Sequence, residues 1–351
     1  MKYTKFYLVA AFLTTTLTLA PAARVSAVAQ QQQPAPPAKQ QKDDKNKKPP
    51  EGEAGEDDQE IKLGTQLVAV PFSVTDKKNR YITDLTKEDI ELTEDGKAQQ
   101  LFSFERQTDL PLTIALVIDI SGSQQYTLPA EKAAAQRFVR KVVRPNKDLV
   151  GVVTFEETPV LVQDLTSNVE KLQQSIDEVR IAAPNPSGMG GTTPPINGGS
   201  RAGTSAMFDA IYAVSSDLLR REAGRRVIIL ITDGINFDSH VKLRDAIERT
   251  WRNEVLIYPI GIGDRSFGGV DEGTLKKIAN ETGGRAFFPD DEEDLDKAFA
   301  LINEDLRQQY LVSYGSSNEA RDGSFRAIQV KVKSRKELTV RHRRGYFAPK
   351  E

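Results

Sequence analysis

A nearly continuous apolar run, Leu112–Ile120 (LTIALVIDI), constrains the fold of this chain more than any other segment. A strand that is apolar at consecutive positions is buried on both faces, as in a parallel sheet covered by helices. Two later runs, Val227–Ile231 and Val255–Ile262, have the same character. Segments with a helical spacing of apolar residues lie between such runs, as in Glu131–Val143. The alternation predicts an α/β domain with a doubly wound, mostly parallel sheet.

The other elements of this region fit the same alternation. Leu149–Phe155 and Val160–Val162 predict a strand pair around a turn. Ser167 and Glu170 have the spacing of a capping box and predict the start of a helix. The Gly- and Pro-rich segment Pro184–Gly203 predicts a loop. Further helices are expected from about Ala206 and over Val241–Trp251, Leu275–Glu281 and Glu292–Gln308.

The segments on either side of the α/β region, 61–108 and 309–351, predict antiparallel strands. Apolar residues alternate with polar ones, as in Val68 to Val74 and Ile328 to Val332, which is typical of strands with one face in water. Each flank is too small to form a core of its own. We therefore expect one β-sandwich-like domain built from both flanks, with the α/β domain, residues 109–308, inserted between them.

The first 60 residues predict export and a tether. Lys2 and Lys5 precede a short apolar run, and small residues follow it, as in a signal peptide that spans residues 1–29. Residues 30–60 are rich in Gln, Pro and charged residues and predict a disordered linker. The apolar run is shorter than a spanning helix requires, and no other segment approaches that length. The sequence thus predicts an exported protein, periplasmic or secreted, with no membrane span after cleavage.

Composition narrows the possible functions. The 351 residues include 48 Lys and Arg and 50 Asp and Glu, for a net charge of −2, which argues against a nucleic-acid partner. Cys is absent, and His240 and His342 are the two histidines, so thiolate and multi-histidine metal sites are excluded. A metal bound to this chain would need oxygen ligands.

Three loops of the predicted sheet carry such ligands. The first strand ends in Asp119-Ile120-Ser121-Gly122-Ser123, and a later strand ends in Thr232-Asp233-Gly234. Between them, Gly203-Thr204-Ser205 precedes a helix. Ligands of open α/β sheets bind at the carboxyl ends of the strands, near the switch in strand order. The hydroxyl and carboxylate side chains therefore predict an oxygen-ligand site for Mg²⁺, or for Mn²⁺ or Ca²⁺.

The D-x-S-x-S, Thr and Asp-Gly motifs, in this order, resemble the von Willebrand factor type A (VWFA) domain and its metal-ion-dependent adhesion site (MIDAS). Ala206-Met207-Phe208-Asp209-Ala210 resembles the helix after the family's Thr, and the flanks, such as TKEDIELTEDGKAQQLFSF, resemble the VWFA-related acidobacterial-type subfamily. The resemblance implies Ser121 and Ser123 as hydroxyl ligands and Asp119 and Asp233 as charge-balancing ligands. The family's Thr lies four residues before the helix Asp, which here is the position of Ser205, with Thr204 as the alternative.

The resemblance implies a non-enzymatic module that binds a protein partner through an acidic residue of that partner. A metal-free scaffold or assembly factor is the alternative within the binding class. A hydrolase that uses His240 is the alternative from another class, but a G-x-S-x-G nucleophile motif is absent from the sequence.

Overall fold

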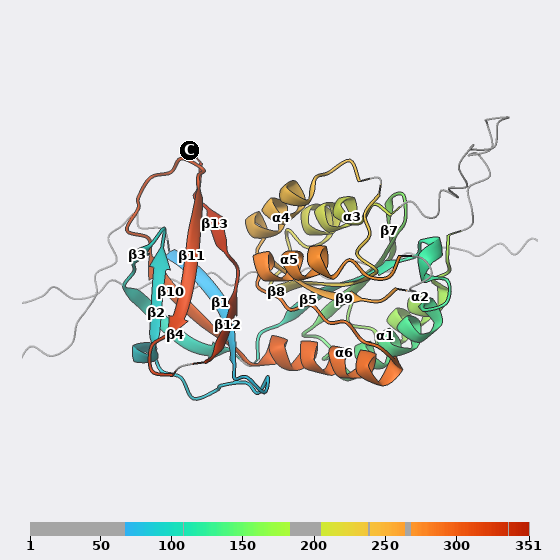
Figure 1. Ribbon diagram of the computed structural model, residues 1–351, viewed down its shortest axis with the longest axis horizontal. Coiled ribbons are helices and arrows are strands. Elements are labelled where there is room, and N and C mark those ends of the chain that lie inside the picture. Colours follow the sequence, from blue (N-terminus) through green and yellow to red (C-terminus); the bar gives the residue numbers. More distant parts are fainter. Residues whose placement is uncertain are drawn as a thin grey trace, which may run out of the picture. The chain divides into compact units, whose positions relative to one another are not determined.

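The computed structural model describes residues 67–107, 109–182, 205–237, 239–263, 268–335 and 337–350. These residues form an α/β domain and a β-sandwich (Figure 1). In this described part of the chain, no helix is both long enough and apolar enough to cross a membrane.

The α/β domain is built on a five-stranded sheet with the order β7-β6-β5-β8-β9. The central strand β5 is parallel to β6 and β8, β8 is parallel to β9, and only the edge strand β7 is antiparallel, to β6. Every residue of β5 is buried, as its continuous apolar sequence predicts. The strands are β5 (Leu112–Asp119), β6 (Leu149–Phe155), β7 (Pro159–Thr166), β8 (Arg225–Thr232) and β9 (Val255–Gly261).

Helices cover both faces of this sheet (Figure 1). Ile114 and Leu116 of β5 belong to a core with α1, α2 and α6, whereas Ala115 and Val117 belong to a core with α3, α4 and α5. The expectation of a doubly wound, mostly parallel sheet is thus confirmed. The helices are α1 (Leu128–Val142), α2 (Val169–Glu178), α3 (Met207–Ala213), α4 (Leu243–Arg252), α5 (Glu272–Thr282) and α6 (Glu292–Arg307), with a π-helical turn at Val214–Leu218 and 3₁₀ turns at Lys87–Asp89 and Gly122–Gln124.

Three local predictions were wrong at helix starts, and one of them concerns α5, which begins at Glu272 rather than at Leu275. The N-cap of α2 is Asn168, whose side chain accepts a hydrogen bond of 2.8 Å from the Lys171 amide, rather than Ser167 in a capping box. Asn is as good a cap as Ser, so sequence alone could not choose between neighbours. Helix α1 begins at Leu128, a turn earlier than Glu131, with Pro129 in its first turn, where Pro is favoured. The loop predicted at 184–203 lies outside the described residues.

The β-sandwich combines strands from both ends of the chain. One sheet has the order β12-β1-β10-β4 and the other β13-β11-β2-β3, so each contains strands from both flanks. In the first sheet, β1 pairs antiparallel with β10, and Val70 lies opposite Val312. The strands are β1 (Leu67–Thr75), β2 (Ile90–Glu94), β3 (Lys97–Ala98), β4 (Leu101–Gln107), β10 (Gln309–Gly315), β11 (Phe325–Val332), β12 (Thr339–His342) and β13 (Gly345–Phe347).

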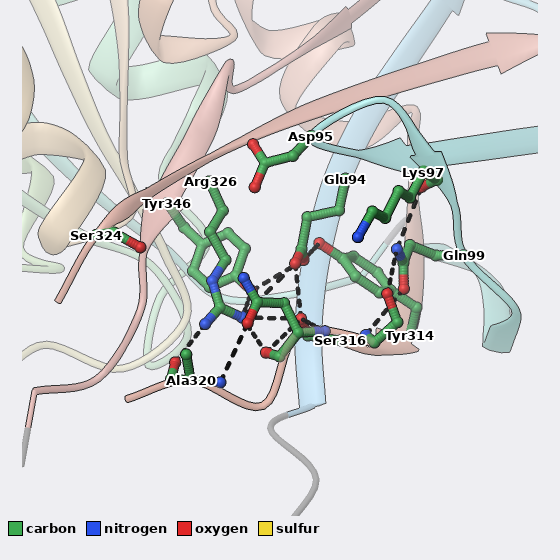
Figure 2. A network of polar contacts seen from close by, with 12 residues as sticks. Glu94, Asp95, Lys97, Gln99, Tyr314, Ser316, Ala320, Ser324, Arg326 and Tyr346 are labelled. Atoms are coloured by element: carbon green, nitrogen blue, oxygen red, sulfur yellow. Dashed lines mark hydrogen bonds and ion pairs between the residues drawn. The ribbon is translucent and has the colours of Figure 1, made fainter. Parts of the chain in front are cut away.

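A buried polar network crosses the core of the sandwich (Figure 2). The Glu94 carboxylate on β2 accepts hydrogen bonds from Tyr314 Oη (2.6 Å), Ser316 Oγ (2.6 Å) and Tyr346 Oη (2.9 Å). Arg326 Nη1 lies 3.6 Å from Glu94 Oε1, and both side chains are 1% exposed. One residue of the N-terminal flank is therefore held by four from the C-terminal flank.

The α/β domain enters and leaves the sandwich at neighbouring positions. Gln107, the last residue of β4, pairs with Gln309, the first of β10. Leu112 and Arg307 follow and precede these two positions closely in sequence. Both donate hydrogen bonds to the buried Asp148 carboxylate, from the Leu112 amide (2.9 Å) and from Arg307 Nη2 (2.7 Å). Burial alone would raise the pKa of Asp148, but hydrogen bonds from Arg144 and Arg307 outweigh it and lower the pKa. Asp148 thus connects the first strand and the last helix of the α/β domain.

Replacement of Arg326 by Met should destabilise the sandwich by about 3–5 kcal/mol, because it leaves the Glu94 carboxylate buried without its cation. The free energy of unfolding, from urea denaturation followed by circular dichroism, measures the effect. Lys331→Met on the exposed face of the same strand is the control and should change it by less than about 0.5 kcal/mol. A loss below about 1 kcal/mol for Arg326→Met would show that the pair is dispensable.

We expect residues 61–108 expressed alone to lack a cooperative unfolding transition, because β1 and β4 would lose their neighbour β10. The exposed strand edges should also promote aggregation. Thermal and urea melts of this fragment, compared with the full chain, test the proposal that the two flanks fold as one unit. A soluble fragment with a sharp transition would refute it.

Candidate metal centre

The candidate site lies at the carboxyl ends of β5 and β8, the adjacent central strands of the sheet. The chain continues from β5 to β6 on one side and from β8 to β9 on the other, so strand order switches between them. Such a switch leaves a crevice above the strand ends, where α/β sheets bind ligands. At this position the two apolar strands end and short polar residues follow them in the sequence.

Asp119, the last residue of β5, connects three segments of the site. Its Oδ1 accepts a hydrogen bond of 2.9 Å from the Ser121 amide. Its Oδ2 accepts one of 2.7 Å from Thr232 Oγ1, at the end of β8, and a longer one of 3.4 Å from Ser205 Oγ. The residue is completely buried. Asp119 therefore links the end of β5 to its own loop, to the end of β8 and to the segment before α3.

Ser121, Ser123 and Asp233 form a second chain of contacts. Ser121 Oγ and Ser123 Oγ lie 3.0 Å apart, and Ser123 Oγ donates a hydrogen bond of 2.6 Å to Asp233 Oδ2. The other Asp233 oxygen accepts the Ile235 amide at 2.9 Å, which holds the loop after β8. The structure thus brings together both carboxylates and both serines that the sequence singled out.

Ser205 also belongs to this cluster, and its backbone is held on two sides. Its carbonyl accepts the Phe237 amide at 3.0 Å, and the next residue, Ala206, donates to the Glu156 carbonyl at 2.6 Å. The side chain is buried, with its hydroxyl directed at Asp119. Thr204 lies outside the described residues.

Burial makes this cluster a favourable place for a cation. It raises the pKa of Asp119 to about 6, and it raises the pKa of Asp233 although hydrogen bonds from Ser123 and the Ile235 amide oppose the change. Both shifts arise because a desolvated carboxylate is costly when no cation balances it. Within the described ranges, no group of three or more His, Cys, Asp or Glu residues could hold a metal. The donor set here combines two carboxylates with three hydroxyls, all hard oxygens, and this suits Mg²⁺ or Mn²⁺.

Three further residues, to which the sequence analysis assigned no role in the site, support the cluster. Thr232 anchors Asp119, as described above. The buried Gln124 donates from Nε2 to the Ile262 carbonyl (3.3 Å) and accepts from Thr127 Oγ1 (3.0 Å), so it links the first loop to the end of β9. A Cβ on Gly263 would lie 2.9 Å from the Asp233 Cβ, so this close approach requires Gly. Thr232 directly precedes Asp233 in sequence, which is the one signal that could have identified it.

Asp209 positions the loop after β8 rather than binding in the cluster. Its carboxylate accepts the His240 and Val241 amides (3.0 and 2.8 Å), and His240 Nδ1 lies 3.0 Å from its Oδ2. The Ser121 amide donates to Asp119 and the Ser123 hydroxyl donates to Asp233, and neither of these hydrogen bonds involves His240. His240 is exposed over 88% of its side chain, so its contact with Asp209 is a hydrogen bond at the surface.

Comparison with known proteins identifies the class of domain that this geometry belongs to. Two family models of the von Willebrand factor type A domain match the chain, over residues 114–236 and 196–301. The chain therefore contains a von Willebrand factor type A domain, as the resemblance of its motifs indicated. The finer assignment to the acidobacterial-type subfamily stays a prediction. A search of curated proteins found no match.

Three solved structures match the chain at low sequence identity. The proximal thread matrix protein 1 of the mussel byssus is 17% identical, with a TM-score of 0.45, over 68% of this chain and 50% of that one. An aerotolerance-related membrane protein from Bacteroides fragilis is 18% identical (TM-score 0.41; 56% of this chain, 98% of that one). A von Willebrand factor type A protein from Catenulispora acidiphila is 14% identical (TM-score 0.44; 72% and 74%). The chain thus spans about half the length of the mussel protein.

Mg²⁺ or Mn²⁺ should raise the melting temperature, because a ligand that binds only the folded state stabilises it by about 2.7 kcal/mol at a hundredfold excess over Kd. Asp233→Asn should remove this shift, since it deletes one of the two carboxylates of the cluster. Thermal melts in metal and in chelator measure it. Asp217→Asn, at an exposed position on the turn after α3, is the control and should keep the full shift. Identical wild-type melts in metal and chelator would argue against a metal site.

Proposed function

We propose that the protein is a non-enzymatic module outside the cytoplasm that binds a protein partner through a divalent metal ion. The observation that carries the proposal is the convergence of Asp119, Ser121, Ser123, Ser205 and Asp233 above adjacent strand ends. In the proposed site, Ser121, Ser123 and Ser205 supply neutral hydroxyl ligands, and Asp119 and Asp233 supply charge directly or through water. Protein interaction is the usual role of von Willebrand factor type A domains, and this supports the binding class.

A metal held mostly by hydroxyls stays electrophilic, because few anions in its coordination shell reduce its charge. Such an ion attracts a carboxylate from another molecule, and charge-assisted contacts in a partly dry site are strong ones. We therefore propose an acidic residue of the partner as the group that completes the coordination. The chain supplies the orientation of the hydroxyls through the hydrogen bonds of Asp119 and Thr232.

The alternative binding function is a metal-free scaffold or assembly factor. The hydrogen bonds within the cluster are compatible with it, because Ser123 already satisfies one Asp233 oxygen. The hydrolase alternative is weaker, since His240 contacts Asp209 and not a site serine. Chelation separates the metal-dependent binding function from the metal-free one, as the next experiment describes.

Capture of a partner from an extracytoplasmic extract should require metal and should be lost in chelator. Ser205→Ala should weaken capture about tenfold or more, by removal of one hydroxyl ligand, whereas Ser205→Thr should be tolerated because it keeps the hydroxyl. Thr204→Ala is the matched control and should have the smaller effect. The amount of partner retained by immobilised protein, quantified with Mg²⁺ and with chelator, gives the comparison.

Two outcomes would change the assignment. Undiminished capture in chelator would favour the metal-free scaffold. A larger effect of Thr204→Ala than of Ser205→Ala would move the ligand to Thr204.

A further inference from the structure

A second concave region lies at the opposite, amino ends of the strands of the α/β sheet. It is a cavity of about 500 Å³ between the end of α4, the start of β8, the start of β1 and the last residues of the chain. Six cationic side chains line it: Arg220, Arg226, Arg249, Arg252, Arg343 and Lys350. Among the described residues, Glu254 is the one carboxylate of the lining. This concentration of positive charge occurs in a chain whose net charge is −2.

Several of these cations are held in place by neighbouring groups. Arg343 is 7% exposed and donates to Glu254 Oε1 (2.9 Å) and to the Ala69 carbonyl (2.8 Å), while its Nε has no hydrogen-bond partner among the described residues. Arg252 bonds Glu248 at 2.7 Å and stacks over the Phe347 ring at 3.8 Å. Fixed guanidinium groups lose little entropy when they bind an anion, so the cavity is organised in advance.

Hydrogen bonds from the arginines to backbone carbonyls explain only part of the clustering of cations around the cavity. Arg226 donates to the Asn253 carbonyl at the end of α4, where cations are expected. Arg343 donates to the Ala69 carbonyl in β1. Arg220 and Lys350 are exposed, and neither side chain forms a hydrogen bond or ion pair with any described residue. Their side chains line the cavity, and no carboxylate of the described residues neutralises their charges.

We propose that this cavity binds a small organic phosphate. A single arginine guanidinium can donate two parallel hydrogen bonds to phosphate oxygens. The lining has six cations and one carboxylate, and this excess of positive charge favours an anion with two or more charges. A volume of about 500 Å³ exceeds that of a bare phosphate and lies in the range of small-molecule sites. Trp251 and Phe347, whose rings lie 6.3 Å apart, form an aromatic part of the lining that suits a ring or apolar group on the phosphate.

Isothermal titration in chelator at constant ionic strength tests the proposal without contribution from the metal centre. Phenyl phosphate should bind, pyrophosphate should bind through charge alone, and phenyl sulfate and benzyl alcohol should bind at least about tenfold more weakly than phenyl phosphate, since they carry one charge or none. The double variant Arg220→Gln/Lys350→Gln should weaken phenyl phosphate binding about tenfold or more, because each charge-assisted hydrogen bond contributes on that scale.

The matched control is Lys277→Gln/Lys331→Gln, which removes the same charge from two exposed positions outside the cavity. It should bind phenyl phosphate like the wild type. Thermal melts should show that both double variants fold, since all four positions are exposed. Equal affinity in the two double variants, equal affinity for phenyl phosphate and phenyl sulfate, or no binding of either phosphate probe would overturn the proposal.

Discussion

The hydrogen bonds of the Asp119 carboxylate are the contacts on which the candidate site depends. They join the end of β5 to its own loop, to Thr232 on β8 and to Ser205 before α3. A completely buried carboxylate without such donors would be too costly to keep charged, so the side chain and the three segments stabilise one another. Parallel strands make this possible, because their carboxyl ends meet at one edge of the sheet.

Sequence predicted the part of the site that follows strand ends. The positions of Asp119, Ser121, Ser123 and Asp233 follow from two apolar runs and from the rule that parallel strand ends converge. The contacts of Gln124 could not be found this way, because they depend on how the first loop folds back toward β9. The same holds for Glu131, which is completely buried on α1 although a Glu in the first turn of a helix is normally an exposed partner of the helix dipole. Burial raises the pKa of Glu131 to about 8, because desolvation favours the neutral form of the carboxyl group.

In the sandwich, the alternation of inward and outward positions along two strands conflicts with the residue types found there. Glu94 has the same parity as the buried Ile90 and Leu92, and Arg326 the same as the buried Ile328. The alternation along each strand predicts that these two side chains face the core, whereas their charge predicts that they face water. The structure resolves the conflict because each charge meets its partner from the other end of the chain. Such a pairing depends on contacts more than 200 residues apart in sequence, which periodicity within a single strand does not report.

The direct pairing of Gln107 with Gln309 has a consequence for how this architecture can vary. From the side of the sandwich, β4 and β10 form a β-hairpin whose connection happens to be an entire folded domain. Since the two crossing points are neighbours, the entropy of closing that connection changes little with what is inserted, provided its ends lie close together. We therefore expect the sandwich to keep its own strand order when another domain, or a short turn, replaces the α/β domain.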